Sequence, residues 1–360
     1  LVTYVVMPPS LLPAGNDWTQ FKGDALRSGN AELASIDVPL GLLAAIPMTD
    51  AIFSSPVVSQ GKIIVMDGAG VVTAIDSGTL RVAWRFATRG GPGNCNNVST
   101  PAIIGSFVHV GTMAGIYYVL DIDDGAVVRE IDCSEPIFAA PLIGQDRVYF
   151  ATLGARVFAI RPNGEQIWTW DFVKQVIGFP GDRWNGQQWL EFRKDRVTWR
   201  DHFVCSREIC LVGDTVVMPA GGRTVFLSDA GDHPELIAIG AIPEYVGQEF
   251  PAAFGQSADA DGNVYVQWHR RDNAGRVEVL SLVDDKVEAS FVTGTETAID
   301  LPGLMSFASV SVRDSDVYRV RPESGFGLCR HRKGEKKPVT LCDAGSICSP
   351  VLTRNHAVYG

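Results

Sequence analysis

A repeat of about forty residues constrains the fold of this chain more than any other feature of its sequence. Three segments share one pattern: residues 52–86, 98–131 and 137–172. Each begins with a small residue and a proline and continues through four short apolar runs separated by polar or glycine-containing turns. The prolines are Pro56, Pro101 and Pro141, with spacings of 45 and 40 residues. The runs are short and rich in β-branched and aromatic residues, which predicts strands rather than helices.

Four strands per repeat at this period are typical of the blade of a β-propeller. Less regular copies begin near Val204, Asp261 and Phe307, and a last copy begins at Ser346 and stops after two strands. We therefore predict an all-β chain that forms a β-propeller of four-stranded blades. Seven blades are expected, or eight if the native chain continues beyond Gly360.

The incomplete last copy predicts that an N-terminal strand closes the last blade, because completion from the other terminus removes exposed strand edges. Residues 41–48 stand where an outer closing strand belongs, and residues 1–7 are expected to supply the third strand. The predicted organisation is an N-terminal extension over residues 1–38 and a propeller over residues 39–360, with an insertion at about residues 173–202.

The turn residues of the repeats resemble the A-x-D-x-x-T-G-x-x-x-W motif of the quinoprotein-like, PQQ-type propeller family. The matching positions are Ala74, Asp76, Thr79 and Trp84 in the first repeat, Asp121 and Gly125 in the second, and Ala159, Gly164 and Trp168 in the third. Leu80 departs from the family pattern, which has glycine there. In this resemblance the glycines permit turns, the aspartates bind backbone N–H groups, and the tryptophans pack between neighbouring blades.

A second resemblance precedes the repeats. Residues 18–29 read WTQFKGDALRSG, similar to the W-x-x-F-x-G-D-x-x-R-x-G motif that often stands before such propellers in secreted bacterial proteins. The resemblance extends well over residues 18–172 and implies the fold. It does not imply one function, because the same blades serve enzymes, assembly scaffolds and sensors.

Family enzymes that bind PQQ use two adjacent cysteines and a calcium-type site, and this sequence has no adjacent cysteine pair. We therefore expect no catalytic residues and no cofactor. Calcium or PQQ remains as an alternative, in which the chain is a PQQ- or metal-dependent oxidoreductase. The candidate metal ligands are Asp259, Asp261 and Asn263, because carboxylates at alternate positions converge in a tight turn. A hydrophilic β-turn is the simpler interpretation of that loop.

The charge of the chain bears on its partners. The formal net charge is −10, which disfavours binding to nucleic acid. No stretch approaches the roughly 20 apolar residues of a transmembrane helix. Other protein subunits are the partners that remain.

The insertion at residues 173–202 interrupts the repeat and carries three of the eight tryptophans together with several basic residues. Tryptophan and arginine are enriched in binding hot spots, so the insertion is a candidate for partner contact. The candidates are Arg183, Trp184, Trp189, Arg193, Arg196 and Trp199. The alternative is an insertion that packs its tryptophans on the propeller rim. A short helix is expected over residues 187–196.

Seven cysteines favour an oxidising compartment, periplasmic or secreted. Cys329 and Cys342 flank a predicted hairpin and are expected to form a cross-strand disulfide. Cys95 and Cys133 precede adjacent blades and form a second candidate pair. Taken together, the sequence predicts a non-catalytic propeller that serves as a binding or scaffold subunit of an extracytoplasmic assembly. A ligand-sensing or carbohydrate-binding module is a further alternative.

Overall fold

The structure is a computed structural model of the chain. It describes residues 2–5, 17–194, 202–241, 252–269, 274–292, 297–298, 309–314, 316–321, 327–332, 334–344 and 348–358. The chain forms two compact units. The first consists of residues 1–24, 33–153 and 157–169, and the second consists of residues 25–32, 154–156 and 170–360.

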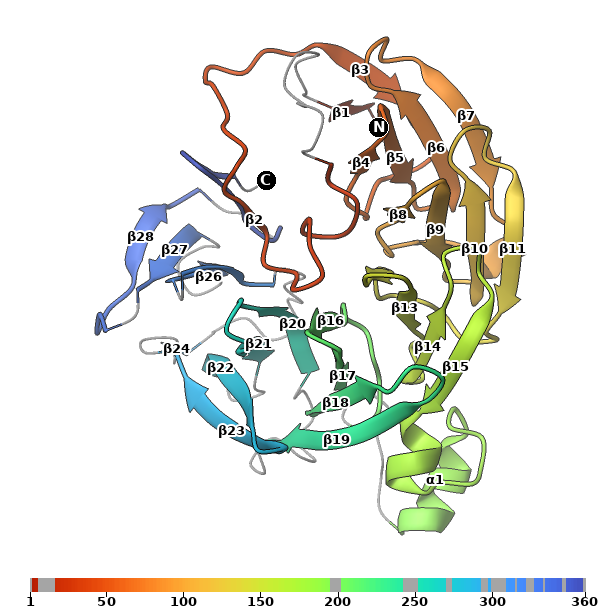
Figure 1. The fold of residues 1–360 in the computed structure, drawn as a ribbon, viewed down its shortest axis with the longest axis vertical. Coiled ribbons are helices and arrows are strands. Elements are labelled where there is room, and N and C mark those ends of the chain that lie inside the picture. Colours follow the sequence, from red (N-terminus) through yellow and green to blue (C-terminus); the bar gives the residue numbers. More distant parts are fainter. Residues whose placement is uncertain are drawn as a thin grey trace. The chain divides into compact units, whose positions relative to one another are not determined.

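Three antiparallel sheets lie wholly or mostly in the first unit, and each contains four strands in sequence order (Figure 1). The first sheet contains β4 (Val57–Ser59), β5 (Lys62–Met66), β6 (Val71–Asp76) and β7 (Val82–Ala87). The second contains β8 (Ala102–Ile104), β9 (Phe107–Gly111), β10 (Ile116–Asp121) and β11 (Val127–Asp132). The third contains β12 (Leu142–Ile143), β13 (Val148–Ala151), β14 (Arg156–Ile160) and β15 (Gln166–Asp171). A 3₁₀ turn, η1 (Gly91–Gly93), separates the first two sheets.

The second unit repeats this arrangement in three further sheets. The fourth sheet contains β16 (Cys210–Val212), β17 (Thr215–Ala220), β18 (Arg223–Asp229) and β19 (Pro234–Ala241). The fifth contains β20 (Ala252–Ala258), β21 (Val264–His269), β22 (Ala274–Val283) and β23 (Lys286–Phe291), and β24 (Thr297–Ala298) also pairs with β22. The sixth contains β25 (Ser311–Arg313), β26 (Asp316–Arg321), β27 (Gly327–His331) and β28 (Val339–Cys342).

The seventh sheet combines strands from both ends of the chain. The strand β2 (Asn30–Ala31) pairs in parallel with β29 (Val351–Thr353), which pairs antiparallel with β30 (Ala357–Val358). This confirms the predicted seven-bladed β-propeller with an N-terminal strand in its last sheet. Two further strands from the N-terminal part of the chain pair with each other. They are β1 (Val2–Val5) and β3 (Ala44–Pro47), which are antiparallel.

Sheet-on-sheet packing explains why the middle strands are mostly buried while the outermost strands are not. In β5 and β6 nearly every residue is buried, whereas β11 is exposed along most of its length. The first and second sheets share one core, to which Ile64, Met66 and Val72 contribute from one side and Val108, Val110 and Tyr118 from the other.

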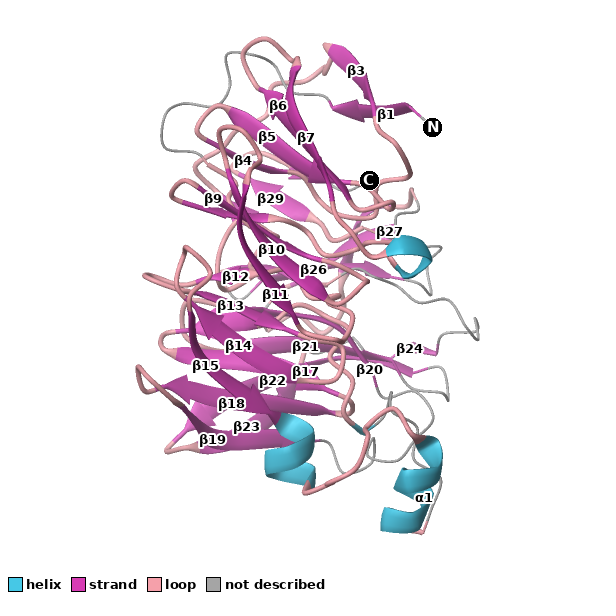
Figure 2. Cartoon of the chain, turned by 90° about the vertical axis from the view of Figure 1, so that its right-hand side faces the viewer, coloured by secondary structure: helices cyan, strands magenta, loops and turns pink. Residues whose placement is uncertain are grey.

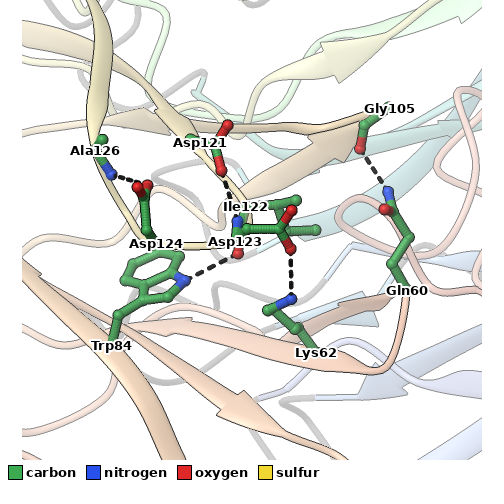
Figure 3. Close-up of polar contacts among 9 residues, drawn as sticks. All are labelled: Gln60, Lys62, Trp84, Gly105, Asp121, Ile122, Asp123, Asp124 and Ala126. Atoms are coloured by element: carbon green, nitrogen blue, oxygen red, sulfur yellow. Dashed lines mark hydrogen bonds and ion pairs between the residues drawn. The ribbon is translucent and has the colours of Figure 1, made fainter.

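The family-type residues form the contacts between the first two sheets (Figure 3). The Trp84 indole donates a hydrogen bond to the Ile122 carbonyl at 2.9 Å. Its ring covers Gly125, where a Cβ would lie 2.6 Å from the nearest ring atom. Lys62 forms an ion pair with Asp123 at 2.9 Å beside this contact. The glycine is therefore required both for its φ of 74° and for the close approach of the tryptophan.

The same contact recurs between the second and third sheets with a different side chain. Arg129 occupies the tryptophan position, and a Cβ on Gly164 would lie 2.7 Å from the Arg129 Cβ. Within the first turn, Asp76 accepts hydrogen bonds from the Thr79 backbone and hydroxyl at 2.7 and 2.8 Å, which lowers the pKa of Asp76. Trp168 is buried in the third sheet, 5.9 Å from the Tyr149 ring.

Candidate protein-binding site

The insertion begins directly after β15 and contains two helical segments in the second unit (Figures 1 and 2). A π-helical turn, η2, spans Val173–Ile177, and α1 spans Gly186–Arg193. The Asn185 side chain caps α1 by accepting hydrogen bonds from the backbone N–H groups of Gln187 and Gln188. At the other end, Lys194 adopts a left-handed conformation that ends the helix.

An aromatic stack holds α1 in place. Trp189 is buried and lies between two rings, with centroid distances of 3.8 Å to Phe179 and 5.6 Å to Phe203. Its indole N–H donates a hydrogen bond to the Arg183 carbonyl at 2.8 Å. The polar end of the indole is therefore satisfied while the rings remove a large apolar area from water.

A buried ion pair fastens the insertion to the end of the third sheet. The Arg183 guanidinium donates to the Asp171 carboxylate at 2.5 Å and to the Gly154 carbonyl. Asp171 also accepts a hydrogen bond from the Lys174 backbone at 3.1 Å. Because both charged groups are nearly buried, removal of either would leave an uncompensated charge. Arg183 and Trp189, two of the residues proposed from sequence for partner contact, thus lie inside the insertion.

Three large apolar side chains of the insertion remain exposed on this rigid base. Trp184, Leu190 and Phe192 are 40%, 42% and 45% exposed. The Trp184 ring meets Phe203 edge-on at 5.5 Å, and the Phe192 ring meets Phe179 edge-on at 5.2 Å. We call these three residues the exposed trio. Sequence reasoning named Trp184 but missed the other two. Both lie on α1, which overlaps the short helix expected over residues 187–196.

Two basic side chains lie at the insertion, Arg193 at the end of α1 and Arg223 beside the His202 carbonyl. Burial lowers the pKa of Arg223, and repulsion from the Arg193 guanidinium lowers it further, which places two positive charges close together. Arg223 also donates a hydrogen bond to the His202 carbonyl at 3.3 Å. Two further sequence candidates, Arg196 and Trp199, lie outside the described residues.

The candidate metal loop is filled by the protein's own hydrogen bonds. The Asp259 carboxylate accepts from the backbone of Asp261 and Asn263, from the Asn263 amide and from the Tyr265 hydroxyl at 2.9 Å. The Asn263 carbonyl oxygen accepts from Ser281 at 2.6 Å. These oxygens are therefore engaged in hydrogen bonds with neighbouring groups of the protein. Within the described ranges no cluster of three or more metal-ligating side chains occurs.

The predicted disulfides are corrected by the structure, in which no two of the seven cysteines are bonded. The hairpin register pairs Cys329 with Thr340, and beyond a β-bulge Cys342 lies opposite Leu328. A shift of one residue turns a side chain to the other face. Cys329 is accordingly buried and Cys342 exposed.

The second predicted pair is also not bonded, with Cys95 exposed and Cys133 buried. Burial also raises the pKa of Cys205 to about 12, which keeps this thiol protonated and unreactive at neutral pH.

One buried titratable pair lies in the second sheet. His109 is fully buried, and its Nδ1 lies 3.1 Å from the Tyr117 hydroxyl. Desolvation lowers the pKa of His109 to about 3 and raises that of Tyr117. The Tyr117 ring stacks on Phe150 of the third sheet at 3.8 Å. Both groups are neutral at physiological pH and serve the packing between sheets.

Comparisons with known proteins agree with this architecture. A family model described as outer membrane protein assembly factor BamB matches residues 27–139, which include the first two four-stranded sheets. The crystal structure of BamB from Moraxella catarrhalis is similar over 100% of this chain and 96% of that one, with a TM-score of 0.63 and 13% sequence identity. The chain shares the β-propeller fold of these proteins.

Dehydrogenases share this propeller fold as well. A europium-containing methanol dehydrogenase has a TM-score of 0.70 and 11% identity, over 96% of this chain and 82% of its own. The quinohemoprotein alcohol dehydrogenase from Comamonas testosteroni has a TM-score of 0.51 and 14% identity, over 94% and 75%. No curated protein matches the sequence. Since an assembly factor and enzymes are both similar, the fold alone does not select the function.

Proposed function

We propose that this propeller is a non-catalytic binding or scaffold subunit of an extracytoplasmic protein assembly, and that a protein partner docks on the exposed trio. The observation that carries the proposal is the position of Trp184 and Phe192, which are exposed yet rest edge-on against buried rings. Aromatic side chains held in this way lose little conformational entropy on binding, which is how hot-spot residues gain affinity.

Two further observations support the proposal. The BamB structure, an assembly factor by name, corresponds to this chain over nearly its whole length. The one loop in which the sequence pattern indicated calcium ligands uses its oxygens for its own turn. In the described part of the chain, no helix is long and apolar enough to cross a bilayer.

The test is co-purification from the native source with Trp184→Ala/Phe192→Ala. Hot-spot truncations cost about 2 kcal/mol or more each, so partner recovery should fall at least about tenfold. Leu236→Ala is the control, because Leu236 is equally exposed, at 43%, on β19 of the same unit. Recovery of a stoichiometric partner by the double variant at the wild-type level would refute docking on the exposed trio.

An absorbance spectrum and metal analysis of the same preparation test the alternative oxidoreductase. A stoichiometric quinone chromophore together with calcium would favour that alternative over the scaffold. A preparation with a protein partner and without a chromophore would support the scaffold.

A further inference from the structure

The N-terminal motif at residues 18–29 contacts the first strand of one sheet after another. In the first unit, Trp18 exchanges two backbone hydrogen bonds of 2.8 Å with Val58 of β4. The next carbonyl, that of Thr19, accepts from the Ile103 N–H of β8 at 2.8 Å. The Gln20 side-chain oxygen then accepts from the Ile143 N–H of β12 at 2.9 Å. Three successive residues therefore accept hydrogen bonds from three successive sheets.

The second unit continues the series with residues 25–29. The Ala25 carbonyl accepts from Leu211 of β16 at 2.8 Å, and the Leu26 carbonyl accepts from Ala258 of β20 at 2.7 Å. The Ser28 and Gly29 carbonyls accept from Val312 of β25 at 3.0 Å and from Leu352 of β29 at 2.7 Å. All seven first strands thus donate to this one segment, and the order of acceptors follows the order of sheets.

The donors occupy a common position in the repeat. In four of the sheets the donating N–H belongs to the residue two positions after the proline that opens the unit. The proline and donor pairs are Pro56 with Val58, Pro101 with Ile103, Pro141 with Ile143, and Pro350 with Leu352. Because the position repeats, the first strands present one regularly placed backbone donor per sheet.

The segment has the conformation that such a series of contacts requires. Its backbone turns through left-handed residues at Lys22, Gly23, Arg27 and Gly29, with φ between 57° and 87°. Gly23 packs under the Trp18 ring, where a Cβ would lie 2.6 Å from a ring atom. Arg27 is fully buried and its Nε donates to the Ile209 carbonyl at 3.1 Å. The motif residues Trp18, Gly23 and Arg27 therefore fix the path of the segment.

We propose that the first strands of the sheets in each unit form a peptide-binding track. Residues 18–20 are the built-in ligand of the track in the first unit, and residues 25–29 are that of the track in the second unit. The ligand class is an extended peptide that supplies one acceptor oxygen per sheet and turns left-handed between acceptors. Satisfaction of buried backbone N–H groups is the driving contact, because each lost partner leaves a buried donor unpaired. This inference goes beyond the proposed function and does not depend on the exposed trio.

The test uses the full chain with a protease recognition sequence inserted after Ser35, next to Leu33, which is 72% exposed. After cleavage, the N-terminal fragment should remain bound through gel filtration. A labelled synthetic peptide of residues 17–31 should then exchange into the cleaved protein. The same peptide with Gly23→Ala and Arg27→Ala should bind at least tenfold more weakly.

A control variant separates the track from the pairing of β1 with β3. Thr3→Pro disrupts that pairing at the position opposite Ile46 and should leave the fragment bound. Release of the fragment by Thr3→Pro, or equal binding of the altered peptide, would overturn the proposal.

Hydrogen exchange on the uncleaved chain gives a second measure. Gly23→Ala should increase exchange in the first strands β8, β16, β20, β25 and β29. Gly105→Ala is the matched control, since Gly105 has a φ of 54° and open space around its Cβ position. Equal exchange in the two variants would also overturn the proposal.

Discussion

The contacts between the repeats and the contacts within the insertion use the same residue type in different ways. In the first unit, Trp84 lies against Gly125 at a position that the repeat specifies. In the insertion, Trp189 is buried between Phe179 and Phe203, while Trp184 remains exposed. The contact of a tryptophan in a repeat can thus be predicted from the position of the tryptophan in the repeat. The burial of a tryptophan in the insertion depends instead on which aromatic rings the fold places beside it.

The largest expected effect is local unfolding of the insertion while the sheets of the repeats stay folded. Trp189→Ala removes the central ring of the insertion's stack, and large aromatic truncations cost about 3–5 kcal/mol. Because α1 and β4–β11 belong to different compact units, exchange should rise over residues 173–203 with little change in β4–β11. Hydrogen exchange measured by mass spectrometry reads both regions at once. Equal loss of protection in the sheets would show that the insertion and the sheets unfold together.

A smaller effect is expected from the repeat contact. Gly125→Ala places a Cβ 2.6 Å from the Trp84 ring at a φ of 74°. Gly178→Ala has nearly the same φ, 73°, with no atom within 4 Å of its Cβ. The control should lose about 1 kcal/mol from backbone strain, and Gly125→Ala about 2 kcal/mol more from the clash. Chemical denaturation gives both values. Similar losses in the two variants would mean that the tryptophan contact adapts to the added methyl group.

The smallest effect, counted per pH unit, is expected in the pH dependence of the unfolding free energy, through His109 in the first unit. Desolvation lowers the folded-state pKa of His109 to about 3, whereas an unfolded histidine titrates near 6.5. The unfolded chain therefore binds a proton first as the pH falls. Stability should decrease below about pH 6.5 by about 1.4 kcal/mol per pH unit and level off near pH 3.

The control for this dependence is His109→Gln, which cannot titrate. The difference in unfolding free energy between variant and wild type should change along that slope between pH 6.5 and 4. A constant difference over this range would contradict a neutral, buried His109.

The repeat made the fold predictable, because its signals are local. Each forty-residue unit contains a small residue followed by a proline, short β-branched runs and glycine turns. Each of these elements depends only on residues nearby in the sequence. The seven-bladed architecture and the joining of an N-terminal strand to the last sheet followed from these signals. The residues of that strand were predicted less accurately. The sequence pointed to residues 1–7 and 41–48, whereas β2 at Asn30–Ala31 joins the last sheet.

The predicted disulfides failed because spacing in sequence does not fix register. The hairpin of β27 and β28 pairs Cys329 with Thr340, and Cys342 lies opposite Leu328 beyond a bulge. The turn of a hairpin fixes its register, and the spacing of two cysteines does not reveal that register.

The sequence by itself determined the propeller fold and the glycine turns, since both depend on local patterns. Only the tertiary structure decided that Arg183 and Trp189 are internal while Trp184, Leu190 and Phe192 face solvent. Likewise, only the tertiary structure showed the hydrogen bonds from seven first strands to residues 18–29. These features rest on contacts between residues that are far apart in the sequence, in one case by more than three hundred positions. No local preference encodes such contacts.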